Sequence, residues 1–341
     1  MSVTALKAAD LPESGNLDEL TRLCKALADE LRLEILRLLK TESFGVLEIC
    51  RVLDIRQSAL SHHLKILAKA GLVSTRREGN SIFYRRPLIL DADPFGDFKN
   101  SAFTNIDRLP LPPETLQRVE LIHQERSQQS LDFFRRNAAK FREKQGLIAE
   151  YQQYAGSLED LIQGIRFTNP PVVMEVGPGA GELLLQLANF FDRVIALDNS
   201  AEMLDQARAT VNANRIGNVE FIHGDITQAP DQELDCDLIV LNMVLHHIPA
   251  PVEVFREAQR LLNPGGVLLL VELISHDQDW VRESCGDLWL GFDTQDLTNW
   301  AIQAGLAEGQ SLYLGLRNGF QIQVRLFVNE TNEGPTAGAD H

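Results

Sequence analysis

The chain has 341 residues, which suggests about two domains at roughly 150 residues each. It carries 32 Lys and Arg against 48 Asp and Glu, a net charge of -16. Taken alone, that charge argues against a nucleic-acid binder, because phosphate contacts need clustered cations. The charge is unevenly distributed, however: residues 51–86 hold 8 basic and 2 acidic residues. DNA binding is therefore a question for this segment and not for the whole chain.

Composition sets the broad class. Hydrophobic residues make up 44% and charged residues 23%, as in a soluble globular protein with a sizeable core. No apolar run approaches the roughly 20 residues of a membrane helix, and the first residues lack the pattern of a secretory signal. The four cysteines lie far apart without a CxxC motif, which favours a reducing compartment. We expect a cytoplasmic protein with no membrane partner.

The order of patterns along the chain predicts two domains and a connector. We expect an N-terminal tail at 1–16, a winged helix-turn-helix of the α+β class at 17–90, and a linker with a helical connector at 91–165. An α/β domain with a mostly parallel sheet should occupy 166–330, and a disordered tail 331–341. Within the connector, residues 91–112 are rich in Pro, Asp and Asn and are expected to be linker.

The N-terminal segment predicts short helices and a hairpin. Asp29 is placed to cap a helix with an apolar stripe that includes Ile35. Another helix should carry Leu60, Leu64 and Leu67 on one face and small polar and basic residues on the other. Two β-type runs flanking Glu78-Gly79-Asn80 predict a wing. The residues expected to contact DNA are Arg56, Gln57, Ser58, Ser61, His62, Lys65, Arg76, Arg77, Asn80 and Arg85, with Arg86 also on the wing. The alternative is a helical bundle whose basic face is merely solvated.

The runs LADELRLEILRLL, QSALSHHLKILAKAGLV and GNSIFYRR resemble the ArsR/SmtB winged-helix family over residues 17–90. The resemblance implies a homodimer on a near-palindromic operator in double-stranded DNA, usually a repressor released by a ligand. The metal chemistry of the family does not transfer, because Cys50 stands alone where metal sensors carry paired cysteines. One thiolate cannot make a tight zinc or arsenic site, so we expect no metal site, and Cys24 and Cys50 should be small buried hydrophobes.

Residues 113–150 predict long helices with phenylalanines at helical spacing, such as Phe134 and Phe141. We expect this connector to pack between subunits and, through SLDFFRRNAAKF, to lie over a ligand. Ligand binding would then be able to shift the DNA-binding heads.

A glycine loop follows the first strand of the α/β domain in PPVVMEVGPGAGELLLQLA. A dinucleotide fingerprint GxGxxG needs Gly at position 182, where this chain has Glu182, whose charge opposes a pyrophosphate at the helix start. Nicotinamide and flavin cofactors are therefore disfavoured. Glu175 can receive an amino group, Asp198 the ribose hydroxyls and Asp225 an adenine amino group, with Met203 and Ile226 on either side of the ring.

These strand-end motifs and a terminal hairpin turning at Asn318-Gly319 resemble class I S-adenosylmethionine-dependent methyltransferases over residues 170–328. The resemblance implies a Rossmann-like fold with a mostly parallel seven-stranded sheet and S-adenosylmethionine or S-adenosylhomocysteine as cofactor. The expected pocket residues are Glu175, Gly177, Gly179, Gly181, Asp198, Asn199, Met203, Asp225, Ile226 and Asn242. The alternative is a Rossmann-like domain that has lost its ligand.

Methyl transfer needs alignment and, for a protonated acceptor, a base. The candidates are His246, His247, Glu272 and His276, with a structural role the more frequent outcome for the two adjacent histidines. Trp280, Trp289 and Phe292 are expected to pack rather than to close the pocket. Whether the chain is an enzyme stays open at this point.

The fusion as a whole resembles regulators of the methionine cycle that respond to S-adenosylhomocysteine, through SHHLK, GNSIFYRR and DWVRE…GDLWLGF. It implies a DNA-binding regulator with an S-adenosyl effector. The alternatives are an active methyltransferase of a small molecule with a DNA-binding domain, and a metal-responsive repressor.

Overall fold

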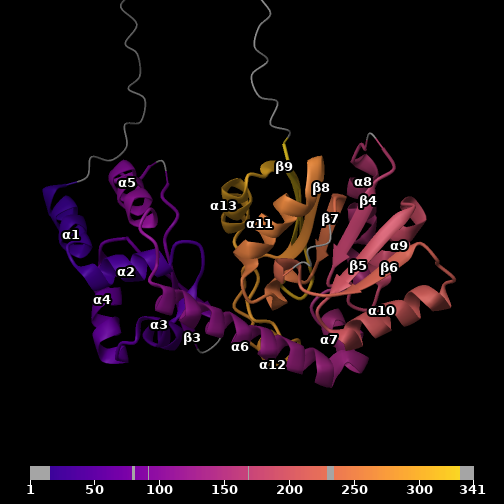
Figure 1. Ribbon diagram of the computed structural model, residues 1–341, viewed down its shortest axis with the longest axis horizontal. Helices are drawn as coiled ribbons and strands as arrows, with labels where there is room; N and C mark the ends of the chain where they lie inside the picture. Colours follow the sequence, from indigo (N-terminus) through magenta and orange to yellow (C-terminus); the bar gives the residue numbers. More distant parts are fainter. Residues whose placement is uncertain (1–15, 79–80, 91, 168, 229–233, 331–341) are drawn as a thin grey trace, which may run out of the picture. The chain divides into compact units, whose positions relative to one another are not determined.

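A computed structural model describes residues 16–78, 81–90, 92–167, 169–228 and 234–330. The chain divides into two compact units, Met1–Ile122 and His123–His341. Each unit is taken by itself below (Figure 1). Among the described residues, no helix combines the length and the apolar character needed to cross a membrane.

The first unit is a small helical domain with a three-stranded sheet in the order β1-β3-β2. Its elements are α1 (Leu17–Leu27), α2 (Glu30–Leu38), β1 (Phe44–Gly45), α3 (Val46–Leu53), α4 (Gln57–Lys69), β2 (Ser74–Glu78), β3 (Ser81–Arg85), α5 (Gly96–Asp107) and the first part of α6 (Pro113–Asn137). The predicted cap is confirmed, since the Asp29 carboxylate accepts the Arg32 backbone N–H at 3.0 Å. The α4 stripe is confirmed as well: Leu60, Leu64 and Leu67 are buried in the core. The expected burial of two cysteines is wrong: Cys24 is exposed, off the face of α1 that the buried Leu23 and Ala26 form, and Cys50 is half-buried.

The expected linker at 91–112 is wrong over its middle, where residues 96–107 form α5. Phe103 and Ile106 of this helix are buried in the core of the first unit. Asp93 organises the approach to the helix by accepting the Phe95 backbone N–H at 2.9 Å and the Lys99 ammonium at 2.6 Å. The polar residues in and around this short helix give the segment the composition of a linker. The helix nevertheless belongs to the core, because one of its faces is apolar and buried.

The second unit is a seven-stranded sheet flanked by helices. After the second part of α6 come η1 (Ala138–Lys140), α7 (Phe141–Gly146), η2 (Tyr151–Gln153), α8 (Ala155–Gly164), β4 (Val172–Val176), α9 (Glu182–Phe190), β5 (Arg193–Asp198), α10 (Ala201–Ala213), β6 (Val219–His223), η3 (Ile226–Gln228), β7 (Cys236–Asn242), η4 (Leu245–His247), α11 (Pro251–Leu261), β8 (Leu262–Leu273), α12 (Trp280–Ser284), α13 (Thr294–Ala304), β9 (Ala307–Gly315) and β10 (Gln321–Val328).

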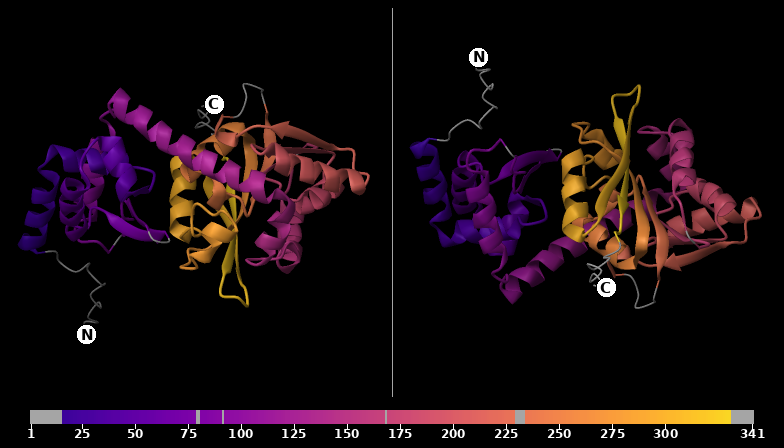
Figure 2. Two further views of the ribbon diagram at one scale, coloured as in Figure 1. Left: turned by 90° about the horizontal axis from the view of Figure 1, so that it is seen from below. Right: turned by 90° about the horizontal axis from the view of Figure 1, so that it is seen from above.

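The strand order β6-β5-β4-β7-β8-β10-β9 confirms the predicted sheet, with β10 antiparallel to both of its neighbours. Helices lie on both sides of the sheet, and the β9–β10 hairpin projects from it (Figure 2). The central strands are mostly apolar, because both of their faces are covered; Val173, Ile195, Val240 and Leu269 are fully buried. The order of strands reverses between β4 and β7, and open α/β sheets bind ligands at the carboxyl ends of such strands.

Candidate functional site

A cavity of about 730 Å³ opens at the carboxyl ends of β4, β5 and β7. This volume lies within the about 300–1,000 Å³ of small-molecule sites. The predicted pocket residues that line it are Gly177, Gly179, Asp198, Asn199, Met203, Asp225, Ile226 and Asn242. Glu175 and Gly181 are not among the lining residues, and both belong to the strand and loop that form the cavity wall.

Two glycines of the loop after β4 occupy positions at which a side chain does not fit. Gly177 and Gly179 have φ values of +66° and +55°, which side chains of other residues rarely adopt. A Cβ at Gly177 would lie 2.3 Å from the Val244 side chain, and one at Gly179 would lie 3.2 Å from the Phe141 ring. The loop therefore leaves its backbone open to a ligand while it packs against the segment that follows β7 and against the start of α7.

Glu175 is the most unusual carboxyl group of the site. It is 1% exposed, and its Oε2 atom has no hydrogen-bond partner within the described residues. Burial, followed by the nearby charge of Asp198, raises the pKa of Glu175 to about 8. A buried carboxyl oxygen without a donor is destabilising unless a ligand supplies one. An ammonium group would supply both a donor and a charge.

Two further carboxylates follow the neighbouring strands. Asp198 ends β5, and one of its oxygens accepts the Ser200 backbone N–H at 2.8 Å. Burial raises the pKa of Asp198 to about 7, although this hydrogen bond opposes the rise. Asp225 follows β6 and accepts from Thr227, and the Asn199 amide donates to its second oxygen at 3.3 Å. The Met203 and Ile226 side chains are buried, as an apolar slot for a flat ring requires.

The sequence analysis missed part of the wall, which comes from residues 141–154. The Arg142 guanidinium pairs with Glu182 at 2.6 Å beside the glycine loop. The Tyr151 hydroxyl donates to Gln186 at 2.6 Å, and the Tyr154 hydroxyl donates to the Asn242 side chain at 3.0 Å. Both tyrosines line the cavity. Their spacing in EYQQY was the only local signal, and it does not identify partners that lie 35 and 88 residues away.

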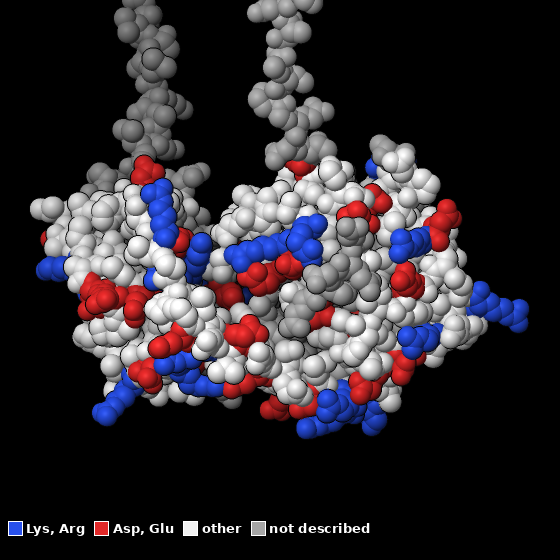
Figure 3. Space-filling view, in the orientation of Figure 1, with Lys and Arg blue, Asp and Glu red and all other residues white. Residues whose placement is uncertain are grey.

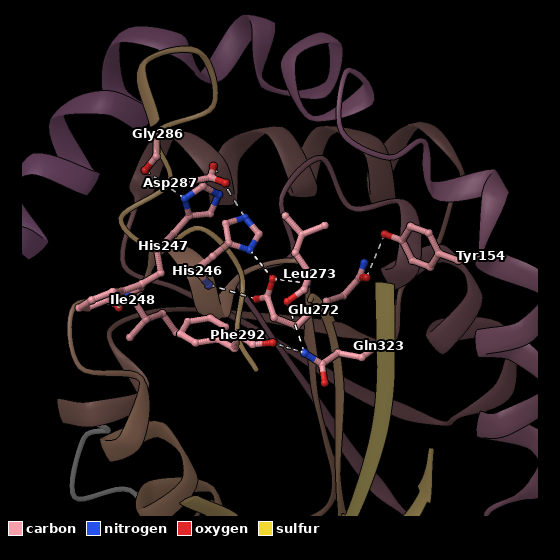
Figure 4. A network of polar contacts seen from close by, with 12 residues as sticks. Tyr154, His246, His247, Ile248, Glu272, Leu273, Gly286, Asp287, Phe292 and Gln323 are labelled. Atoms are coloured by element: carbon pink, nitrogen blue, oxygen red, sulfur yellow. Dashed lines mark hydrogen bonds and ion pairs between the residues drawn. The ribbon is translucent and has the colours of Figure 1, made fainter. Parts of the chain in front are cut away.

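Of the four catalytic candidates, only His247 is among the residues that line the cavity. His247 lines the cavity, whereas His246 and Glu272 lie buried behind it (Figure 4). The Glu272 carboxylate accepts the His246 Nδ1–H at 2.6 Å and the backbone N–H groups of His246 and Leu273 at 3.1 and 2.6 Å. Burial opposes the charged form of His246, but Glu272 and Asp287 raise its pKa to about 9.

The pKa of His247 is shifted in the opposite direction from that of His246. Burial and the charge of His246 lower the pKa of His247 well below its usual value. The Nδ1 atom of His247 lies 3.2 Å from the Gly286 carbonyl oxygen, which only accepts, so Nδ1 carries the proton. The rings of Phe134 and Phe141 pack edge-on against His247, with the Phe134 centroid at 4.9 Å. His276 is not among the residues that line the cavity, and its ring packs on Phe320.

The aromatic residues after β8 pack, as expected. Trp289 is buried and donates to the Ile248 carbonyl oxygen at 2.8 Å. The Phe292 ring lies 5.5 Å from that of Trp300. Trp280 is partly exposed and donates to the Gln278 side chain. None of the three predicted residues lines the cavity.

The first unit exposes most of the residues expected to contact DNA. Arg56 and the polar face of α4, comprising Gln57, Ser58, Ser61, His62 and Lys65, are exposed. On the wing, Arg77 is exposed and Arg85 is half-buried, and the Arg76 guanidinium lies 2.5 Å from the buried Glu78 carboxylate. Asn80 lies outside the described residues. On the face drawn in Figure 3, acidic and basic side chains are interspersed over the second unit, without an extended patch of one sign.

Arg86 differs from the expectation that it lines the wing for DNA. Its guanidinium donates to the Leu36 carbonyl oxygen at 2.6 Å and to both oxygens of Asp107 at 2.7 and 3.1 Å. It also lies over the Phe103 ring, 4.5 Å from the centroid. Arg86 therefore joins α2 to α5, and all three nitrogens of its guanidinium group donate to these two partners.

Comparison with protein families adds a description to each unit. Residues 29–75 match the model described as bacterial regulatory protein, arsR family. Residues 174–270 match the model described as methyltransferase domain. S-adenosylmethionine is the cofactor of such a domain, and its charged amino group, its ribose and its flat adenine are chemically complementary to the carboxyl groups and the buried apolar side chains at this cavity.

Curated relatives match part of the chain. A malonyl-[acyl-carrier protein] O-methyltransferase of Marinomonas sp. (strain MWYL1) is 26% identical over 43% of this chain and 53% of its own length. An arsenite methyltransferase of Aquipseudomonas alcaligenes is 40% identical over 28% of this chain and 31% of its own length. The alignments thus span less than two thirds of these relatives. Their names cover very different methyl acceptors, so the similarity does not select one.

Solved structures match the same region. The N-methyltransferase NodS from Bradyrhizobium japonicum WM9, in complex with S-adenosyl-L-homocysteine, is 16% identical with a TM-score of 0.42, covering 56% of this chain and 98% of that one. A putative methyltransferase from Haloferax volcanii, solved with its Trm112 activator, is 17% identical with a TM-score of 0.49, covering 58% and 98%. The chain thus joins a helix-turn-helix segment of the arsR family to a methyltransferase domain.

Proposed function

We propose that this protein is a DNA-binding transcriptional regulator whose methyltransferase domain binds S-adenosylhomocysteine or S-adenosylmethionine as an effector. The main observation in support of the ligand is the buried Glu175 carboxyl group beside a cavity of about 730 Å³. Its Oε2 atom lacks a hydrogen-bond donor within the described residues. A ligand that carries an ammonium group, a ribose and a flat ring complements Glu175, Asp198 and the slot between Met203 and Ile226.

The DNA-binding half of the proposal depends on α4 and the wing. The exposed face of α4 carries small polar and basic side chains, which is what a recognition helix presents to base edges and phosphates. Arg77 and Arg85 on β2 and β3 are suited to phosphate contacts. As a homodimer, the protein would present two such heads to half-sites about one helical turn of DNA apart.

Helix α6 supplies a physical connection between the two functions. Within the first unit, Arg118 of α6 donates to the Val52 carbonyl oxygen at 3.2 Å, at the end of α3 and directly before the turn into α4. Within the second unit, Ser127, Ser130 and Phe134 of the same helix line the cavity. A shift of α6 on ligand binding would therefore reach the turn that positions α4.

We propose S-adenosylhomocysteine as the stronger effector. The two ligands differ by a methyl group and the sulfonium charge, and the rings of Phe134 and Phe141, with centroids 5.3 Å apart, make part of the cavity wall apolar. An apolar wall removes hydration from a sulfonium, whereas the neutral thioether loses little. The acidic residues Glu175 and Asp198 serve the amino and ribose groups, which both ligands share.

The test is operator binding with and without each ligand. A duplex selected in vitro from a random library with the full chain is titrated by fluorescence anisotropy, alone and with saturating S-adenosylhomocysteine or S-adenosylmethionine. We expect the first ligand to weaken DNA binding at least ten-fold and the second to do so less. Asp198→Ala should abolish the effect while leaving binding of the ligand-free protein to DNA intact. Calorimetry that finds neither ligand bound, or DNA binding unchanged by both, would contradict the proposal.

An active methyltransferase is the second candidate, supported by the curated relatives' names and by His247 at the cavity wall. It predicts formation of S-adenosylhomocysteine from S-adenosylmethionine when a methyl acceptor is added, above the level of a Glu175→Ala, Asp198→Ala control. A metal-responsive repressor has less support at the cysteines. Within the described residues, Cys24 and Cys50 belong to no cluster of three metal-binding side chains.

A further inference from the structure

Three buried side chains, one of them at the cavity wall, form an arrangement to which the proposed regulator function assigns no role. One ligand atom each from His246, His247 and Asp287 can be chosen so that all three lie within 4.8 Å of one another. All three residues are buried. They come from η4 and from the loop after α12, segments about 40 residues apart in the chain. In Figure 4 the two imidazoles and the Asp287 carboxylate face one another.

Both imidazoles are oriented from behind. His246 donates its Nδ1–H to the Glu272 carboxylate at 2.6 Å, and His247 donates its Nδ1–H to the Gly286 carbonyl oxygen at 3.2 Å. In each ring the Nε2 atom is therefore the one left to coordinate. Metal-binding histidines almost always make this kind of hydrogen bond to a carboxylate or a backbone carbonyl, because it fixes the tautomer and the ring direction.

The two imidazoles lie close to each other, as ligands of one ion do, but slightly closer than in a formed site. Two imidazoles that bind one ion through Nε2 at about 2.1 Å have centroids about 4.6 Å apart at a 90° angle and about 5.3 Å apart at the tetrahedral angle. The centroids of His246 and His247 are 4.2 Å apart, with the rings inclined by 58°. The Asp287 oxygen lies 4.0 Å from His246 Nε2, and the two atoms would have to approach to about 3 Å when an ion binds.

The geometry points to a site for one divalent first-row transition-metal ion, held by His246 Nε2, His247 Nε2 and the Asp287 carboxylate, with Glu272 as the outer hydrogen-bond acceptor. Two histidines and one carboxylate are a donor set used for zinc and for non-haem iron. Three protein ligands leave a coordination position open, and His247 lines the cavity, so the ion would stand at the cavity wall. The competing arrangement is a proton on His246 between two carboxylates, with no ion.

The experiment uses the full chain, stripped of metal by chelating resin, and titrated first with Co²⁺ and then with Zn²⁺. We expect one Co²⁺ per chain at this site, visible through its ligand-field absorption bands, and displacement by Zn²⁺. Asp287→Asn and His246→Gln should weaken Co²⁺ binding at least ten-fold. Glu272→Gln should weaken it by roughly ten- to hundred-fold, the usual effect of removing an outer hydrogen bond to a ligand.

Matched controls separate this site from general metal affinity. Asp279→Asn makes the same chemical change at an exposed position nearby, and His223→Gln does so for an exposed histidine. Both should bind Co²⁺ like the unmodified chain, as should a Cys24→Ser, Cys50→Ser variant. Tryptophan fluorescence during urea unfolding, measured in parallel, checks that each variant is folded. Should His246→Gln fail this check, Asp287→Asn carries the test.

The inference is overturned if the unmodified chain binds Co²⁺ no more tightly than Asp287→Asn does, or if Asp279→Asn causes an equal loss. It stands or falls independently of the proposed function, since a chain that binds no S-adenosyl ligand can still bind the ion, and the reverse also holds.

Discussion

Glu175 of β4 lies beside the strand that ends at Asp198, and burial together with the charge of the Asp198 carboxylate raises the pKa of Glu175. The two strands run parallel in register, with Glu175 beside Ala196 and the last residue of β5 two positions further on. This places two acidic groups at one edge of the sheet, where each is costly to ionise unless a ligand is present. Burial in the ligand-free protein favours the protonated form of both groups, whereas a ligand that carries an ammonium group favours the carboxylate form.

Ligand affinity should rise with pH. Free Glu175 has a pKa of about 8 and Asp198 one of about 7, so both are largely protonated at pH 6. An ammonium group favours the carboxylate form, so binding should release protons below pH 8. We expect S-adenosylhomocysteine to bind at least ten-fold more tightly at pH 8 than at pH 6. Calorimetry in buffers of different ionisation enthalpy measures both the affinity and the proton release, and a pH-independent affinity would contradict the assigned role of Glu175.

Stability without ligand should change in the opposite direction. The pKa of Glu175 is higher in the folded state than the usual 4.5, so its stabilising contribution is present below about pH 4.5 and is lost as pH rises through 8. Glu175→Gln should therefore raise the free energy of unfolding of the second unit by about 1–2 kcal/mol at pH 8.5, with little gain at pH 5. All three tryptophans, Trp280, Trp289 and Trp300, belong to this unit, so their fluorescence during urea unfolding reports on it alone. Equal gains at both pH values would point to a cause other than ionisation.

The hydrogen bond between Tyr154 and Asn242 should position the ligand. Tyr154→Phe removes a hydroxyl that donates at 3.0 Å to a side chain of the cavity wall. We expect a loss of about 1 kcal/mol in stability and weaker S-adenosylhomocysteine binding by several-fold, because the Asn242 amide is then free to rotate. Tyr313→Phe, at an exposed position on β9, is the matched control and should change neither quantity. Comparable effects of the two substitutions would remove Tyr154 from the site.

Two wing arginines should behave differently. Arg77→Ala should weaken binding to DNA of any sequence and reduce the slope of log affinity against log salt by about 1, as expected for one lost phosphate contact. Arg86→Ala should instead destabilise the first unit by about 2–3 kcal/mol, because Asp107 and the Leu36 carbonyl oxygen lose their shared partner. Arg22→Ala on the exposed face of α1 is the control for a lost positive charge. An unchanged salt slope for Arg77→Ala would argue against the wing as a phosphate contact.

Helix α6 should carry the coupling between ligand and DNA. Insertion of two glycines between Ile122 and His123 breaks the helix where the two units meet in the chain. We expect the inserted protein to bind both S-adenosylhomocysteine and the selected duplex with unchanged affinity, while the ligand no longer alters DNA binding. Retention of the full ligand effect would show that the coupling follows another route, such as contacts between subunits.

The amino-acid sequence by itself determined the order of elements and the chemistry at the strand ends. The cap at Asp29, the buried stripe of α4, and the strands that precede the glycine loop, Asp198 and Asp225 all follow from local patterns, because they depend on residues within a few positions of one another. The seven-stranded sheet, which the structure confirms, was implied by the family resemblance that these strand-end motifs carry. The ligand and DNA roles of these residues stay predictions, to be tested as described above.

Only the tertiary structure decided which residues meet across long distances in the chain. Arg86 looked like a wing residue until its partner Leu36, 50 positions away, was seen. Residues 91–112 looked like a linker because the apolar face of α5 is too short to form a clear pattern. The core that buries this face is built from other helices, which the local sequence does not reveal. Tyr154 meets Asn242 across 88 residues, and the two histidines meet Asp287 across about 40. Such contacts have no periodicity in the sequence, because they arise where separate elements pack together; a local pattern predicts an element and its buried face, but not the partner that covers it.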